Sequence, residues 1–99
     1  MDAKKTLWKA TEDALNSLGK STMQMITWQM NKMDVEMAPD NFDIKKFAVA
    51  LNGLLGEGAE MVLNLAYANL CRQLKIDLAD PGLPALDKIN RVLETKKMN

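Results

Sequence analysis

Apolar side chains recur at intervals of three and four residues along most of the chain, a spacing typical of amphipathic helices. The first series that shares one helical face consists of Leu7, Thr11, Ala14, Leu15 and Leu18. Gly19 follows directly, and glycine readily adopts the left-handed conformation in which many helices end. The pattern therefore predicts a first helix that ends near Leu18.

A second helix is predicted to begin near Ser21. The Ser21 hydroxyl can cap the first turn, and Gln24, three residues later, can complete a capping box. The helix is expected to fade between Lys32 and Asp34, before the turn-forming residues 38–41.

The third predicted helix spans residues 42–55, with Asn41 or Asp43 as its N-cap. Gly56 or Gly58 interrupts the pattern after it. Its broad apolar face consists of Ile44, Phe47, Ala48, Leu51, Leu54 and Leu55.

A fourth helix, the most apolar of the chain, is predicted from Glu57 to the Asp80-Pro81-Gly82 break. The residues expected on its core side are Met61, Val62, Leu65, Ala66, Asn69, Leu70 and Leu74. A fifth helix is expected to start at Pro84 and to present Leu86, Ile89, Val92 and Leu93 on one face.

No segment alternates β-branched and polar residues over five or more positions, so strands are not expected. The sequence predicts an all-α protein, a compact bundle of four to five short helices with antiparallel neighbours. We expect residues 1–80 to form a four-helix domain. Residues 81–99 would form a hinge and a C-terminal helix that either packs in the same domain or serves as a dimerisation arm.

Charge and composition narrow the range of partners. The 99 residues contain 13 basic and 13 acidic side chains, and this balance disfavours nucleic acid as the main ligand. Glu57 and Glu60 interrupt the most apolar window, so no membrane span is expected. The single cysteine, Cys71, and the lack of a signal-peptide pattern indicate a cytoplasmic protein.

Candidate chemistry is sparse, because the sequence contains no histidine. Cys71 is expected in the core, and the acidic pairs Glu57/Glu60 and Glu12/Asp13 fit helix-surface positions. No catalytic residue, cofactor or metal ligand is therefore predicted, and we expect a protein that is not an enzyme. The glycine-rich residues 53–58 precede a helix N-terminus, where they can form a tight corner or hold an anion.

Methionine is the unusual feature of the composition. Of the eight methionines, those in or just after the second helix are Met23, Met25, Met30, Met33 and Met37. Methionine fills irregular gaps in cores and also forms adaptable partner surfaces. Met23, Ile26, Met30 and Met33 share one face of that helix, whereas Met25, Trp28 and Gln29 point to another. Some large apolar side chains should then be exposed in a monomer, and a dimer would cover them. The candidate contact residues are Met25, Trp28, Gln29, Leu86, Ile89 and Leu93.

The order of several short motifs resembles small archaeal helical domains known as Nitrososphaeria output domains. These motifs are residues 14–21 (ALNSLGKS), the Pro-Asp loop, Phe47 with Ala50-Leu51, and residues 53–60 (GLLGEGAE), followed by a long apolar helix. The similarity covers roughly residues 8–78. It implies an intracellular domain that occurs alone or attached to signalling proteins, with no defined activity and no catalytic residues.

The function hypothesis from the sequence is a non-enzymatic protein–protein interaction module, a signalling output or adaptor domain that self-associates as a homodimer. The alternative is a small DNA-binding regulator of the helix-turn-helix type, indicated by the short turn at residues 19–21.

Overall fold

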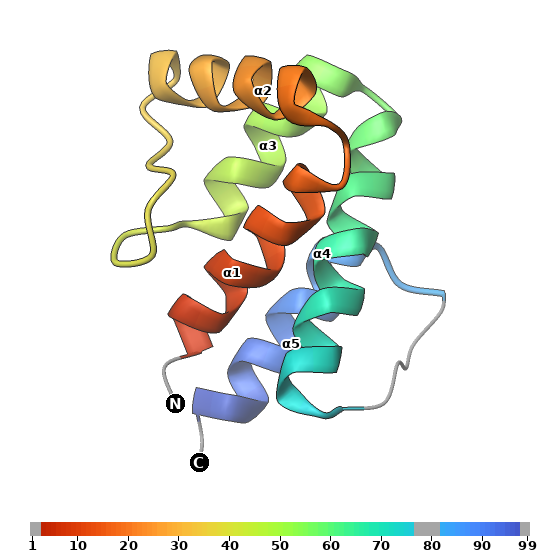
Figure 1. Cartoon of the computed structure of the whole chain (residues 1–99). Coiled ribbons are helices and arrows are strands. Elements are labelled where there is room, and N and C mark those ends of the chain that lie inside the picture. Colours follow the sequence, from red (N-terminus) through yellow and green to blue (C-terminus); the bar gives the residue numbers. More distant parts are fainter. Residues whose placement is uncertain (1–2, 77–81, 98–99) are drawn as a thin grey trace.

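The computed structural model describes residues 3–76 and 82–97, and within them it contains helices and no strand (Figure 1). The all-α prediction is confirmed. The helices, in chain order, are α1 (Ala3–Asn16), α2 (Lys20–Lys32), α3 (Ile44–Leu55), α4 (Gly58–Leu74) and α5 (Ala85–Lys97).

The centre of the fold is the antiparallel pair α1 and α4, which lie side by side along most of their length (Figure 1). Small side chains, among them Ala10 and Ala66, are fully buried and let the two backbones approach closely. The Asn69 side-chain amide of α4 donates to the Ala10 carbonyl oxygen at 3.1 Å. Thr11, the buried polar residue of α1, donates its hydroxyl to the Leu7 carbonyl oxygen at 2.9 Å, so its burial leaves no polar group unsatisfied.

Helix α2 lies across one end of the molecule and packs on α1 and α3 (Figure 1). Only Ile26 and Met30 of its residues are buried. The arrangement therefore departs from a simple bundle of antiparallel neighbours, because one helix crosses the others and keeps much of its surface exposed.

The start of α2 differs from the prediction. Helix α1 ends at Asn16, two residues before Leu18, and α2 already begins at Lys20. Gly19 has a φ of 101° and is the N-cap of α2, without a side-chain hydrogen bond. Ser21 is therefore inside the helix, and the predicted capping box is wrong because glycine takes the N-cap position first.

Of the two alternative caps for α3, the structure has Asp43. Its carboxylate accepts hydrogen bonds from the backbone amides of Lys45 and Lys46 at 3.0 and 3.3 Å. The helix starts at Ile44 rather than at Phe42, whose buried ring instead packs edge-on against Trp8 with ring centroids 5.3 Å apart. Gly56, with a φ of 58°, forms the corner between α3 and α4.

Helix α4 ends earlier than predicted, at Leu74 rather than near Asp80. Lys75 adopts the left-handed conformation, and the Ile76 amide donates back to the Cys71 carbonyl oxygen at 2.9 Å. This is a helix stop with lysine where glycine is usual, so the sequence carries no signal for it. The Asp80-Pro81-Gly82 break lies mostly outside the described residues.

The core-facing side of α4 is also rotated relative to the prediction. Met61 and Leu65, expected in the core, are 59 % and 38 % exposed. Leu63 and Tyr67, which are not among the residues expected on the core side, are buried instead, and Cys71 is buried as expected.

Helix α5 packs on α1, α3 and α4 of its own chain. The Glu60 carboxylate of α4 accepts a hydrogen bond from the Ala85 amide at 2.8 Å, in the first turn of α5. Lys88 donates to the side-chain oxygen of Asn64 at 3.1 Å and lies over the Tyr67 ring at 4.8 Å. These polar contacts with α4 set the position and register of α5.

Candidate functional site

Large exposed apolar side chains lie on α2 and at its C-terminal end. Met25, Trp28 and Met33 are 43 %, 57 % and 51 % exposed, and Gln29 is half-buried between them. We call these four residues the α2 face. The spacing places Met33 on the same side as Ile26, but Met33 is the C-cap residue at the end of the helix and is about half exposed.

Trp28 is held in place by a cation. The Lys32 ammonium lies 4.1 Å from the centre of its ring, a geometry worth about 0.5–1 kcal/mol at an exposed site. This contact leaves the indole 57 % exposed, so the ring is accessible to a partner. Tryptophan is among the residues that contribute most to binding energy at protein interfaces.

The apolar surface continues from α2 onto α3. A shallow groove of about 390 Å³ lies between α3 and the segment that follows α2. It is lined by Met33, Val35, Lys45, Lys46, Val49 and Ala50. Val49 is 74 % exposed, although it is a β-branched apolar residue in the middle of a helix.

The structure separates the α5 candidates from the α2 candidates. Ile89 is fully buried in the core, and Leu86 and Leu93 are half-buried against their own chain. Leu86 borders a small hollow next to Val49, whereas Leu93 lines a different pocket. The six candidate contact residues therefore do not form one surface, and the three on α2 do.

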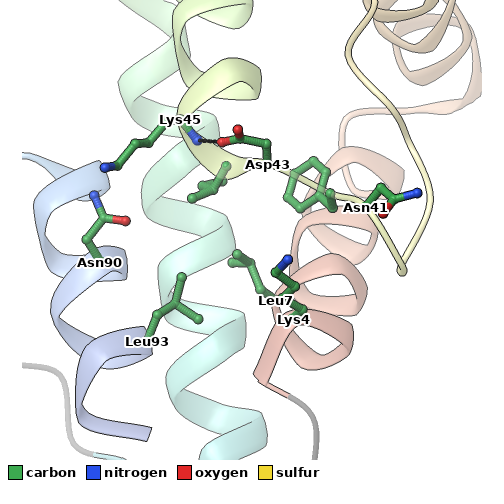
Figure 2. Close-up of a pocket in the computed structure, with 9 residues that line it drawn as sticks. Lys4, Leu7, Asn41, Asp43, Lys45, Asn90 and Leu93 are labelled. Carbon is green, nitrogen blue, oxygen red and sulfur yellow. Dashed lines mark hydrogen bonds between the residues drawn. The ribbon is translucent and has the colours of Figure 1, made fainter. Parts of the chain in front are cut away.

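That second pocket, of about 450 Å³, lies where α1, the start of α3 and α5 meet (Figure 2). It is lined by Lys4, Leu7, Asn41, Phe42, Asp43, Ile44, Lys45, Asn90 and Leu93. Sequence reasoning missed it, because its residues come from three segments that lie far apart in the chain and show no shared motif.

The glycine-rich residues 53–58 join the end of α3 to the start of α4. The first amides of α4 are already bonded locally, from Ala59 to the Gly56 carbonyl oxygen at 3.1 Å and from Glu60 to the Glu57 carbonyl oxygen at 3.3 Å. The structure supports the reading of this segment as a tight corner between helices.

Three of the four acidic residues considered for catalysis have structural partners. Glu60 binds the first amide of α5, and Lys9 lies 3.7 Å from Glu12 and 3.4 Å from Asp13. Cys71 is a free thiol buried in the core. Within residues 3–76 and 82–97, no three histidine, cysteine or acidic side chains lie close enough to share a metal ion.

Comparisons with known proteins do not assign this chain to a family. No family model, curated protein or solved structure matches this chain. Among the described helices, none has both the length and the apolar character to cross a bilayer. What is established is a small, compact, all-helical domain.

Proposed function

We propose that this protein is a non-enzymatic interaction module that pairs with a second copy of itself through the α2 face. The observation that carries the proposal is the exposure of Met25 and Trp28 on a helix that has only two buried residues, together with the exposure of Met33 at its C-cap. Large apolar side chains that gather on an exposed surface are typical of interaction sites.

The charges around α2 favour a second copy as the partner. Lys20 is the first residue of α2, where a positive charge opposes the helix dipole, and the helix contains no acidic residue. Asp34 and Glu36 follow its other end. If two α2 helices pair antiparallel about a two-fold axis, Lys20 of each lies near Asp34 and Glu36 of the other. This pairing would bring opposite charges together at both ends of the interface.

The expected dimer is weak. Association costs at least about 4 kcal/mol of lost translational and rotational freedom, and the α2 face offers only a few large side chains against it. We therefore expect a dimer that forms in the micromolar range and exchanges readily, as suits a switchable contact.

The resemblance to archaeal output domains is consistent with this role. It supports the further proposal that the protein works inside the cell as an output or adaptor domain in signalling, where regulated self-association transmits a state to other proteins.

The test is the molar mass by light scattering over a concentration series that reaches the high micromolar range. We expect the mass to rise from monomer to dimer, and the Trp28→Ser variant to raise the dissociation constant about tenfold or more. Met61→Ser is the matched control, because Met61 is 59 % exposed but lies on α4. A wild-type protein that stays monomeric, or a Met61→Ser variant with the larger effect, would contradict the proposal.

A DNA-binding role is the second candidate. Residues 17–19 join α1 and α2 in a short turn that contains glycine, as in helix-turn-helix motifs. The exposed side of α2, however, presents methionine and tryptophan, with Lys20 and Lys32 as its only basic residues. A gel-shift titration at low salt tests this candidate, and retardation that Lys20→Gln and Lys32→Gln together abolish would favour it over the dimer.

A further inference from the structure

The sulfur-containing residues that the structure describes differ sharply in exposure. Met25 and Met33 of the α2 face are exposed, and so is Met61 on α4. Met30, in contrast, is fully buried, and the single thiol of the chain, Cys71, is buried in the core. A dissolved oxidant therefore reaches the surface thioethers before it reaches the thiol or the core methionine.

The two exposed methionines of the α2 face lie within the surface that pairing would cover. Met25, Gln29 and Met33 follow one another at intervals of four residues, which places them along one side of α2 and its C-terminal end. Met25 also precedes Trp28 by three residues, a spacing at which side chains on a helix are neighbours. A chemical change at either sulfur thus alters the proposed contact surface itself.

The thioether of methionine can be oxidised and restored. A lone pair of the sulfur takes one oxygen atom of hydrogen peroxide, the O–O bond breaks, and the other oxygen leaves as water with both protons. The sulfur is oxidised by two electrons and the peroxide is reduced. In the reverse reaction two thiols of a reductase supply the electrons, become a disulfide, and release the oxygen as water.

The sulfoxide is polar, whereas the thioether is apolar. Its oxygen accepts hydrogen bonds from water, and burial against an apolar surface removes them without replacement. Two sulfoxides on each copy therefore oppose a contact that depends on the burial of apolar side chains. Because Met30 and Cys71 are out of reach, this oxidation changes the surface and leaves the fold intact.

We propose that Met25 and Met33 form a reversible oxidation site that controls pairing through the α2 face. As thioethers they permit the contact, and as sulfoxides they prevent it. The inference rests on the proposed function, since it requires the pairing that it regulates. The oxidant is a peroxide, and the agent that restores the contact is a thiol-dependent methionine sulfoxide reductase.

Dilute hydrogen peroxide, peptide mapping by mass spectrometry and light scattering test the proposal on the full chain. We expect Met25 and Met33 to gain oxygen faster than Met30, with Trp28 and Cys71 unmodified. The dissociation constant of the dimer should rise about tenfold or more, which corresponds to about 1.4 kcal/mol. Treatment with reductases for both sulfoxide stereoisomers, together with a dithiol, should return it to its first value.

A leucine double variant, Met25→Leu with Met33→Leu, separates oxidation from a loss of apolar surface. Leucine keeps an apolar side chain and takes up no oxygen, so this variant should dimerise and keep its dissociation constant after peroxide treatment. Met61→Leu is the matched control, because it removes an exposed thioether from α4. The control should remain as sensitive to peroxide as the wild type.

The reduced wild-type protein tests the pairing itself: if it stays monomeric, the proposed function and the oxidation site both fall. If the reduced protein dimerises, two results overturn the oxidation site alone. One is a dimer that persists after Met25 and Met33 are both oxidised. The other is a leucine double variant that loses its dimer in peroxide as the wild type does, which would place the sensitive sulfur elsewhere.

Discussion

Gly53 and Gly56 lie three residues apart and place opposite demands on the backbone. Gly56 has a φ of 58°, which strains any residue with a side chain, whereas Gly53 lies inside α3 with open space around it. Gly56→Ala should lower the free energy of unfolding by about 1–2 kcal/mol. Gly53→Ala should raise it by about 0.5–1 kcal/mol, because alanine favours the helix. Urea denaturation measures the free energy of unfolding of both variants. If both substitutions change it in the same direction, the corner between α3 and α4 is not where the structure places it.

Single residues also show how far sequence reasoning reaches. Asp43 is predictable as one of two caps, because aspartate at a helix start has a known hydrogen-bonding role. Lys75 is not predictable as a helix stop, since lysine rarely takes the left-handed conformation. Its conformation depends on Ile76 packing against the core, which is a tertiary effect that local propensity does not contain.

At the scale of elements, a carboxylate of α4 caps the first turn of α5. Glu60 accepts from the Ala85 amide at 2.8 Å, and so caps a helix 25 residues further along the chain. Glu60→Ala should lower the free energy of unfolding by about 1 kcal/mol and speed amide hydrogen exchange in α5 more than in α1.

Glu57→Ala is the control for this contact. Glu57 precedes α4 and makes no side-chain cap hydrogen bond, so its loss should leave exchange in α5 unchanged. If both variants speed amide hydrogen exchange in α5 equally, the effect comes from the loss of any negative charge near the start of α4 and not from the loss of the hydrogen bond to Ala85.

The charge pattern of α2 predicts that one substitution, Lys20→Glu, stabilises the monomer but weakens the dimer. Lys20→Glu places a negative charge at the start of the helix and should stabilise the monomer by about 0.3–1 kcal/mol. The same change brings a third carboxylate close to Asp34 and Glu36 of a second copy, and should weaken the dimer. Thermal denaturation at low concentration and light scattering at high concentration measure the two effects, and a dimer that tightens would rule out the antiparallel pairing.

The helices themselves could be predicted, but not the face that each one buries. In α4 apolar residues occur around most of the circumference, so their spacing allows more than one core side. The choice depends on α1, whose small residues Ala10 and Ala14 admit one side of α4 and leave Met61 outside. The buried side of α4 therefore cannot be predicted from the sequence of α4 alone, because it depends on the surface of α1.

At the scale of the whole molecule, the crossing of α2 over the end of the other helices produces the surface on which the proposed function depends (Figure 1). The methionine-rich composition indicates that some apolar side chains are exposed, and Met25 and Trp28 are. The second pocket was not predictable, because it requires Lys4 and Leu93 to meet across the fold. Contacts between distant segments are set by topology, and no local pattern encodes them.

The central claim, that the α2 face pairs with a second copy, is tested most directly through Trp28 itself. The chain has two tryptophans, so a Trp8→Phe variant, which keeps an aromatic ring beside Phe42, leaves Trp28 as the only indole. Its fluorescence should move to shorter wavelength as the concentration rises, in step with the increase in molar mass, because the dimer removes the ring from water. A mass that doubles while the emission stays that of an exposed indole would contradict the account and place the interface elsewhere.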